Sequence, residues 1–356
     1  MKIAQVAPLF ESVPPRFYGG TERIVSYLTE ELVGRGHEVT LFATGDSKTA
    51  GKLVACWPEG LRLMRATDPI LPHVLALEQV YGRAEEFDII HFHVEYLHFL
   101  SLRNASVPHL TTVHNRLDLP LSRSLYHCFN GSPLVSISRD QRNHLPFVNW
   151  FGSVHHGLPE NLLPFQLRGD GYLAFLGRAS PEKGLDRAIE IARRTRHKIR
   201  VAAKIDQVDL EYFYRHVQPL LAEAHVDFIG EISESQKPEF LGRAKALLFP
   251  VDWPEPFGLV MIEAMACGTP VIAFDRGSVR EIVLHGHTGY IVDSVEEAAH
   301  AVNRLGAIDR WRCRRHFMEN FLASHMADNY LNIFKKVIKW KKNWIEPSRL
   351  RASGTS

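Results

Sequence analysis

Several features that mark particular protein classes are missing from this chain of 356 residues. Its four cysteines lie far apart and form no CxxC pair, which argues against a disulfide framework and a structural zinc site. No uninterrupted apolar run is long enough to span a bilayer, and no basic region with an apolar run precedes the first strand-like segment. We therefore expect neither a membrane span nor a signal peptide. The chain also contains no P-loop and no Asp-x-Asp triplet.

What is present is typical of a cytoplasmic globular protein. Hydrophobic residues make up 45% of the chain and charged residues 23%. The length predicts about two domains, each able to bury a full core. The net charge of +2 conceals a basic tail, because the chain from Leu331 onward contains five Lys and two Arg but only one Glu.

The tail between Ile333 and Trp344 mixes apolar and basic residues at helical spacing, and two interpretations remain open. One is a terminal helix whose apolar stripe docks on the protein while its lysines face solvent. The other is a basic amphipathic helix on an anionic lipid surface, which predicts a peripheral contact at the inner membrane face.

Strand and helix signals alternate along the chain, which predicts α/β architecture with parallel, doubly wound sheets. The first helix is expected through Ile24, Leu28 and Leu32 with Thr21 as its cap. Other helices are expected at Leu185–Thr195, Asp209–Ala222, Glu234–Ala244 and Leu259–Ala266. The predicted strands are Ile3–Ala7, Glu38–Thr44, Asp88–His93, His109–His114, Pro133–Ser138, Tyr172–Leu176, Arg200–Ile205, Val226–Gly230, Ala246–Pro250 and Pro270–Phe274.

The most informative stretch runs from Glu255 through Pro-Phe-Gly-Leu to Glu263. Gly258 allows a backbone to approach a ligand closely, and a helix start is a ready anion site. Carboxylates on either side of that helix start could hold hydroxyls that flank a bound diphosphate, as in a nucleotide-sugar. The alternative is that Glu255 and Glu263 are ordinary solvated helix residues.

A second stretch combines a predicted buried strand, the loop Gly177–Gly184 and a helix start. Arg178 in this loop can bind two phosphate oxygens at once, and Lys183 can act as a point charge. This layout suits phosphate binding. The alternative is a surface loop with incidental basic residues.

Taken together, these motifs resemble the retaining glycosyltransferase family 4 of the GT-B fold over nearly the whole chain. The resemblance rests on Gly19-Gly20, Thr111-Thr112-Val113-His114, Gly177-Arg178, Lys183-Gly184, Glu255 to Glu263, Gly268-Thr269-Pro270-Val271-Ile272 and Gly286-His287-Thr288-Gly289-Tyr290. It implies two Rossmann-like domains facing a cleft. The expected acceptor domain is residues 1–160, with a helix at about 325–345 crossing back to it, and the expected nucleotide-sugar donor domain is residues 165–325.

The resemblance also implies roles for individual residues. Glu263 would hold the ribose hydroxyls, Glu255 would hold the donor sugar, and His114 would contact a sugar hydroxyl. The implied catalytic residues are Glu255, Arg178, Lys183 and His114, and the implied donor-binding residues are Gly19, Gly20, Phe257, Gly258, Leu259 and Glu263. The chain departs from the family at His155-His156-Gly157, where relatives often carry Asn-Gly, so no contact is assigned there.

The resulting prediction is a metal-independent retaining enzyme of carbohydrate biosynthesis with no cofactor and no nucleic-acid partner. It would move a sugar from a nucleotide-diphospho-sugar to a sugar, lipid-linked or small-molecule hydroxyl acceptor. The alternatives are a sugar phosphorylase or nucleotide-sugar epimerase on the same fold, or a non-catalytic nucleotide-sugar-binding protein. We also expect His91 and His93 to point to opposite faces of their strand, which disfavours a shared metal site.

Overall fold

The computed structural model describes residues 1–64, 66–102 and 107–352. The chain forms two compact units, each with its own parallel sheet. Unit 1 consists of Met1–Gly157 together with the chain from Ala323 onward, and unit 2 consists of Leu158–Leu322. No helix in the described ranges is both long and apolar enough to cross a membrane.

Unit 1 contains a seven-stranded sheet in the order β3-β2-β1-β4-β5-β6-β7. The first three strands in the chain pair in parallel, with Ile3 opposite Val39 and Leu41 opposite Leu53. The strands of unit 1 are β1 (Lys2–Val6), β2 (Glu38–Thr44), β3 (Lys52–Trp57), β4 (Ile89–Phe92), β5 (His109–Val113), β6 (Leu134–Ser136) and β7 (Trp150–Ser153).

Helices cover both faces of this sheet because its central strands are apolar on both faces. In β2, Leu41 and Ala43 pack in one core cluster with Val25 of α1, whereas Phe42 belongs to another with Leu77 of α2. The helices of unit 1 are α1 (Gly20–Gly34), α2 (Ile70–Tyr81), α3 (Phe99–Leu102), α4 (Pro120–Cys128), α5 (Arg139–Asn143) and α13 (Ala323–Ala352), with a 3₁₀ turn at Ala84–Glu86.

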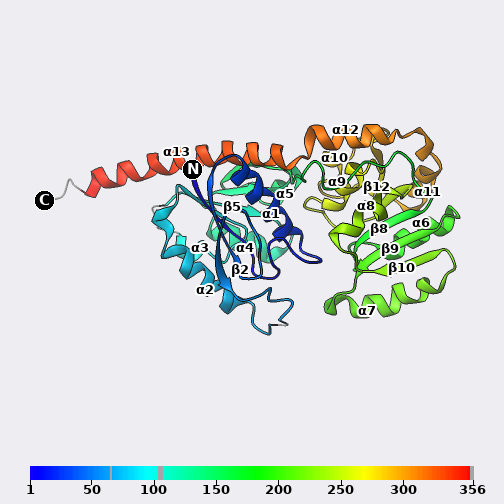
Figure 1. The fold of residues 1–356 in the computed structure, drawn as a ribbon, viewed down its shortest axis with the longest axis horizontal. Coiled ribbons are helices and arrows are strands. Elements are labelled where there is room, and N and C mark those ends of the chain that lie inside the picture. Colours follow the sequence, from blue (N-terminus) through cyan, green and yellow to red (C-terminus); the bar gives the residue numbers. More distant parts are fainter. Residues whose placement is uncertain (65, 103–106, 353–356) are drawn as a thin grey trace. The chain divides into compact units, whose positions relative to one another are not determined.

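Helix α13 lies along unit 1 as one long helix (Figure 1). Its apolar side is buried, with Phe334 and Val337 at 0% exposure, and it contacts α1, β5 and β7. The docking interpretation of the tail is therefore confirmed for its apolar stripe. The lysines of this helix differ in exposure, and Lys341 is buried. Lys335, Lys336, Lys339 and Lys342 are exposed.

Unit 2 contains a six-stranded parallel sheet in the order β10-β9-β8-β11-β12-β13. Its central strands are again apolar on both faces, and β11 and β12 are buried throughout. The strands of unit 2 are β8 (Leu173–Arg178), β9 (Ile199–Lys204), β10 (Val226–Gly230), β11 (Ala246–Phe249), β12 (Val271–Phe274) and β13 (Gly289–Val292).

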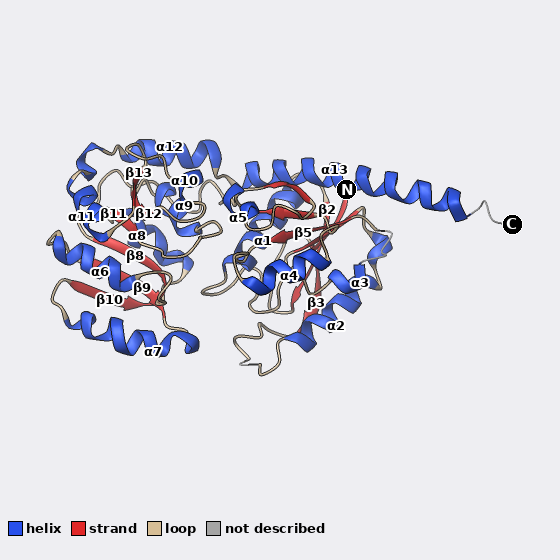
Figure 2. Ribbon diagram, turned by 180° about the vertical axis from the view of Figure 1, so that it is seen from behind, coloured by secondary structure: helices blue, strands red, loops and turns tan. Residues whose placement is uncertain are grey.

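Helices flank the strands of unit 2 on both sides (Figure 2). Helices α6 and α11 contact each other in one layer, whereas α9 contacts α8 and α12 in the other. The helices of unit 2 are α6 (Leu185–Arg194), α7 (Leu210–Tyr212), α8 (Lys237–Gly242), α9 (Leu259–Ala266), α10 (Val279–Ile282), α11 (Val295–Asn303) and α12 (Arg310–Asn320). Further 3₁₀ turns lie at Gln207–Asp209, Gln218–Ala222, Glu234–Gln236 and Leu305–Ala307, and a π-helical turn lies at Phe213–Val217.

Two local predictions are wrong. The first helix begins at Gly20 with Gly19 as its N-cap, so Thr21 is not the cap and no side chain caps the helix. The predicted helix Asp209–Ala222 is a succession of short 3₁₀, α and π turns. Pro219 lies within this segment, and a proline lacks the amide that a continuous helix requires.

Candidate functional site

The loop that carries Glu255 follows β11 and leads into α9 at Gly258. Gly258 is the N-cap of α9 and has a φ of 78°, a left-handed conformation that favours glycine. A Cβ at this position would lie 2.7 Å from Met261 Cε and 2.9 Å from Phe249 Cζ. Leu259 opens the helix, and the first amides of a helix have no intrahelical acceptor.

The turn after β12 fixes this loop from the side. The Ser278 amide donates to the Glu255 carbonyl at 2.9 Å, and the Ser278 hydroxyl donates to the Phe257 carbonyl at 2.8 Å. A Cβ at Gly277 would lie 2.3 Å from the Glu255 carbonyl oxygen, so the two backbones are in close contact. These contacts hold the main chain of the Glu255 loop against the turn that follows β12.

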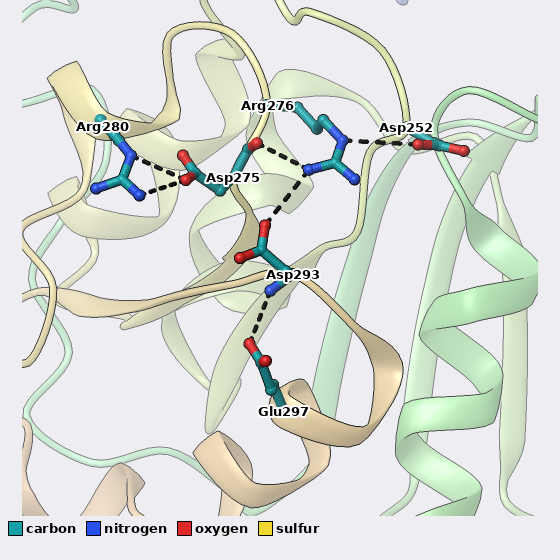
Figure 3. Close-up of polar contacts among 6 residues, drawn as sticks. All are labelled: Asp252, Asp275, Arg276, Arg280, Asp293 and Glu297. Atoms are coloured by element: carbon teal, nitrogen blue, oxygen red, sulfur yellow. Dashed lines mark hydrogen bonds and ion pairs between the residues drawn. The ribbon is translucent and has the colours of Figure 1, made fainter.

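A network of ion pairs surrounds the same turn (Figure 3). Arg276 Nε lies 3.7 Å from Asp252 Oδ1, and Arg276 Nη1 lies 3.4 Å from Asp293 Oδ1. Asp275 pairs with Arg280 at 2.5 Å. The network links the ends of β12 and β13 to the loop that begins after β11. Sequence reasoning did not single out these residues.

Lys183 and Glu255 form a direct ion pair, with Lys183 Nζ 2.5 Å from Glu255 Oε2. Trp253 Nε1 donates to the same carboxylate oxygen at 2.9 Å, and its ring lies 4.8 Å from Lys183 Nζ. The Glu255 side chain is 8% exposed and that of Lys183 is 19% exposed. A partly buried ammonium therefore lies against the loop that leads from β11 into α9.

Arg178 is the last residue of β8, and the loop that follows it carries Lys183. Its guanidinium pairs with Glu182, and its Nε lies 3.0 Å from Asp209 Oδ2. Burial raises the pKa of the Asp209 carboxyl, and the charge of Arg178 opposes that rise. Two carboxylates thus hold the guanidinium in place.

Glu263 lies inside α9 with its side chain 4% exposed. Lys237 Nζ lies 2.5 Å from Glu263 Oε1 and 3.2 Å from Glu234 Oε2. Sequence reasoning missed Lys237, although it opens α8 directly after a Ser233–Gln236 capping box near the end of β10. A buried carboxylate is stable as a charge when it is paired in this way.

In unit 1, His114 follows directly after β5 and is buried. Its Nε2 lies 2.9 Å from His93 Nδ1, and its ring stacks on that of His156 at a centroid distance of 5.3 Å. Burial lowers the pKa of His114 to about 3, so the imidazole is neutral. The main chain of His114 is held by Glu95, whose carboxylate accepts from the amides of His114 and Asn115.

Glu95 is a second residue that sequence reasoning missed. It has a φ of 54°, an uncommon conformation for a residue with a side chain, which often marks a functional region. Burial raises the pKa of its carboxyl to about 7, against two backbone hydrogen bonds that lower it. Its position just after the end of β4 could have marked it as a site residue, because ligands of open α/β sheets bind at the carboxyl ends of the strands.

The expectation that His91 and His93 point to opposite faces is wrong. Residues two positions apart in a strand share a face, and the two ring centroids lie 4.1 Å apart. His91 Nε2 lies 2.7 Å from Thr112 Oγ1. Within the part of the chain that the structure describes, no group of His, Cys, Asp and Glu side chains has the geometry of a metal site.

Gly19 and Gly20 begin α1 after β1. A Cβ at Gly19 would lie 2.8 Å from Pro15 Cβ and 3.2 Å from Glu22 Oε2, so a side chain there would collide with the preceding turn. Glu22 lies in the first turn of α1, and burial raises the pKa of its carboxyl to about 7.

The structure therefore brings some of the predicted residues into contact, whereas others contact residues that were not predicted. In unit 2, Lys183 contacts Glu255, which shares its loop with Phe257, Gly258 and Leu259. Glu263 pairs instead with Lys237. In unit 1, the Gly19-Gly20 turn follows β1 and His114 follows β5.

Comparisons with known proteins agree with this architecture. Residues 166–320 match the family model described as glycosyl transferases group 1, and residues 18–151 match that of glycosyltransferase family 4. The chain is a glycosyltransferase with the GT-B fold. Both halves of this glycosyltransferase match glycosyltransferase models, so the assignment does not rest on one part of the chain alone.

Relatives extend over different shares of the glycosyltransferase. Spore coat protein SA of Bacillus subtilis is 23% identical over 94% of this chain and 100% of its own length. Alpha-maltose-1-phosphate synthase of Mycolicibacterium smegmatis is 31% identical over 46% of this chain and 48% of its own. Among solved structures, Anabaena Alr3699/HepE in complex with UDP-glucose superposes with a TM-score of 0.70 at 19% identity, covering 94% of this chain and 100% of that one.

Proposed function

We propose that this glycosyltransferase moves a sugar from a nucleotide-diphospho-sugar to a hydroxyl acceptor with retention of the anomeric configuration and without a metal ion. The observation that carries the proposal is the contact between the Arg178–Lys183 loop and the Glu255 loop, through the 2.5 Å pair of Lys183 with Glu255. Cations for a diphosphate and a carboxylate for sugar hydroxyls are thus adjacent.

Positive charge at the leaving group is the main catalytic contribution in the proposed reaction. The bond between the anomeric carbon and the diphosphate oxygen breaks, and charge accumulates on the diphosphate. Arg178, Lys183 and the helix start of α9 stabilise that charge where an enzyme with a metal would use the ion. In the free protein Arg178 and Lys183 are paired with carboxylates, so diphosphate oxygens would replace or share these partners.

Two carboxylates divide the recognition of the donor. Glu255 holds hydroxyls of the sugar, because it lies beside the cations and the α9 helix start. Glu263, kept as a paired charge by Lys237, holds the ribose hydroxyls. In unit 1, the Gly19-Gly20 turn offers backbone amides and His114 offers its ring as proposed ligand contacts.

Retention follows from attack on the same face that the leaving group occupies. The acceptor oxygen forms its bond to the anomeric carbon, and the acceptor proton passes to an oxygen of the departing diphosphate. The products are the glycoside and the nucleoside diphosphate. UDP-glucose is the first donor to test, since a protein of the same fold has been solved with it.

We also propose a peripheral membrane contact through α13. Lys335, Lys336, Lys339 and Lys342 are exposed on this helix, whereas its apolar stripe is buried in unit 1. The contact would therefore be electrostatic, without insertion of apolar side chains. It favours a lipid-linked acceptor.

The test begins with a thermal-shift screen of UDP-, GDP- and ADP-sugars in excess EDTA, because a ligand that binds only the native state raises the melting temperature. The donor found is then incubated with acceptors, and proton NMR identifies the anomer formed. We expect turnover in EDTA and an unchanged anomeric configuration. Inversion, or a reversible loss of activity with EDTA, would contradict the mechanism.

The same assay separates the alternatives. An epimerase would convert the donor without any acceptor. A phosphorylase would require inorganic phosphate or a sugar phosphate in place of the nucleotide-sugar. A binding protein would show a thermal shift but no product with any acceptor.

A further inference from the structure

Three buried polar side chains form a continuous chain in unit 1, from the middle of β1 to the end of β5. Gln5 Oε1 lies 2.8 Å from His93 Nε2, and His93 Nδ1 lies 2.9 Å from His114 Nε2. Gln5 is 0% exposed, His93 is 1% exposed and His114 is 9% exposed. Solvent therefore has little access to these hydrogen bonds.

Both histidines in this chain are neutral. Burial lowers the pKa of His93 well below its usual range, and the neighbouring imidazoles of His91, His114 and His156 lower it further. Burial alone lowers the pKa of His114 to about 3. A neutral imidazole has one N–H donor and one acceptor nitrogen, so each ring can make these hydrogen bonds in only one way.

The positions of the ring protons follow from Gln5. A carbonyl oxygen can only accept, so His93 Nε2 carries the proton that Gln5 Oε1 receives. His93 Nδ1 is then an acceptor, and His114 Nε2 must donate to it. This leaves His114 Nδ1 with a lone pair. That nitrogen is buried and has no hydrogen-bond partner among the residues that the structure describes.

We propose that Gln5 and His93 are positioning residues that fix His114 as the Nε2–H tautomer, so that Nδ1 accepts a hydrogen bond from a hydroxyl of the bound sugar. The sugar contact rests on the proposed function, whereas the tautomer is a property of the free protein. The arrangement selects a ligand group that can donate. It disfavours groups that only accept at that position, such as a carboxylate, a methyl ether or fluorine.

The other contacts that His114 makes with described residues do not determine its tautomer. Glu95 accepts from the main-chain amide of His114, which fixes the position of the residue but not its ring proton. The stacked ring of His156 contacts the face of the imidazole, away from the nitrogen lone pairs. The orientation of the Gln5 amide therefore controls the acceptor at the far end of the chain.

Nitrogen-15 NMR of the full-length free protein, labelled at histidine, tests the tautomer directly. The His114 signals are those missing from the spectrum of His114→Gln. We expect a protonated Nε2 and an unprotonated Nδ1. A protonated Nδ1 would mean that the Gln5 amide is turned with its nitrogen toward His93, and it would overturn the inference.

Variants test whether Gln5 acts through His93. Gln5→Met keeps the side-chain length but removes the acceptor, so both His114 tautomers should appear. Thr112→Val is the matched control, because it breaks the buried hydrogen bonds to His91 and Tyr330 and removes neither hydrogen bond of the Gln5–His93–His114 chain. It should leave the His114 spectrum unchanged. A single unaltered tautomer in Gln5→Met would exclude Gln5 as the positioning residue.

Binding tests the sugar contact with UDP-glucose and its deoxyfluoro analogues, in which fluorine replaces one hydroxyl at a time. One analogue should bind about tenfold more weakly than UDP-glucose, the size of one lost hydrogen bond. This discrimination should vanish in His114→Ala and shrink in Gln5→Met. Equal discrimination in wild type and His114→Ala would overturn the hydroxyl contact. If UDP-glucose fails to bind wild type, the proposed donor is wrong, and the NMR spectrum still decides the tautomer.

Discussion

Lys183 Nζ lies 2.5 Å from Glu255 Oε2, although the two residues are 72 positions apart in the sequence. The pair joins the loop after β8 to the loop after β11, which are neighbouring strands of the unit 2 sheet. Ligands of open α/β sheets bind at the carboxyl ends of the strands, where these loops lie. The pair therefore places charges of both signs where a diphosphate and a sugar can bind together.

Removing either cation should slow the reaction far more than it destabilises the fold. Lys183→Ala and Arg178→Ala should each lower kcat by about 10²-fold or more, because each removes preorganised charge at the leaving group. Arg194→Ala is the control, since Arg194 lies half-exposed in the last turn of α6 and, among the described residues, forms an ion pair with Glu190 alone. Steady-state kinetics with the donor found by the thermal screen would measure the effect. A loss equal to that of Arg194→Ala would remove the residue from the site.

Gly258→Ala should damage both the helix start and donor binding. The left-handed φ and the close Met261 and Phe249 contacts predict a loss of about 1–3 kcal/mol in the free energy of unfolding. Gly34→Ala is the matched control, since no atom lies within 4 Å of a Cβ there and alanine favours a helix. Urea denaturation should show opposite signs for the two variants. Equal effects would contradict the assigned conformation of Gly258.

Buried histidines should make the protein sensitive to acid. Burial lowers the pKa of His114 to about 3 and that of His109 to about 4, and the pKa values of His91, His93, His98 and His156 also lie well below 6.5. Unfolding below pH 6.5 therefore takes up protons, and the free energy of unfolding falls as pH falls. Each histidine contributes up to about 1.4 kcal/mol per pH unit in its window.

Two buried carboxyls act in the opposite direction. Burial raises the pKa of Glu22 and of Glu95 to about 7, so between pH 7 and 4.5 the folded state holds protons that the unfolded state releases. Six histidines outweigh two carboxyls, and the net effect remains a loss of stability in acid. Urea denaturation from pH 8 to 4 should show it. His98→Gln should reduce the slope by about one proton, and an unchanged slope would contradict the assignment of a neutral, buried His98.

The exposed lysines of α13 predict salt-sensitive binding to anionic vesicles. Each could contribute about 1 kcal/mol at low ionic strength. Replacing Lys335, Lys336, Lys339 and Lys342 by Gln should abolish sedimentation with anionic vesicles while preserving the melting temperature, because these side chains are exposed. Neutral vesicles are the control. If the parent protein does not sediment with anionic vesicles at low salt, the membrane contact is wrong and a small soluble acceptor gains support.

Elements with strong local signals were predicted most accurately. The predicted bounds of β2 and α9 agree with the structure, because Val39, Leu41, Phe42 and Ala43 give β2 a strong strand signal and α9 lies between Gly258 and Gly268. The edge strands β3, β7 and β13 were missed. β3 carries the apolar run Leu53–Trp57, a strand signal that sequence reasoning did not use, and in the structure only Cys56 of this strand is buried.

The candidate site was only partly predictable for a similar reason. Motif residues such as Arg178 and Glu255 lie in short segments next to glycine or proline, and these segments could be recognised in the sequence. Lys237 lies 26 positions from Glu263 and becomes its partner only through the fold. The same holds for Gln5 and His93, which are 88 positions apart and meet because β1 and β4 are neighbours in the sheet.

The central claim is that Glu255 binds the sugar and Glu263 binds the nucleotide in a metal-free donor site. The most direct measurement is calorimetric titration of Glu255→Ala and Glu263→Ala in EDTA, with UDP and with UDP-glucose. Glu263→Ala should weaken UDP binding by roughly 1–3 kcal/mol. Glu255→Ala should leave UDP affinity nearly unchanged while turnover falls and the additional affinity for the sugar is lost. Unchanged UDP affinity in Glu263→Ala, or equal losses for UDP and UDP-glucose in Glu255→Ala, would contradict the account.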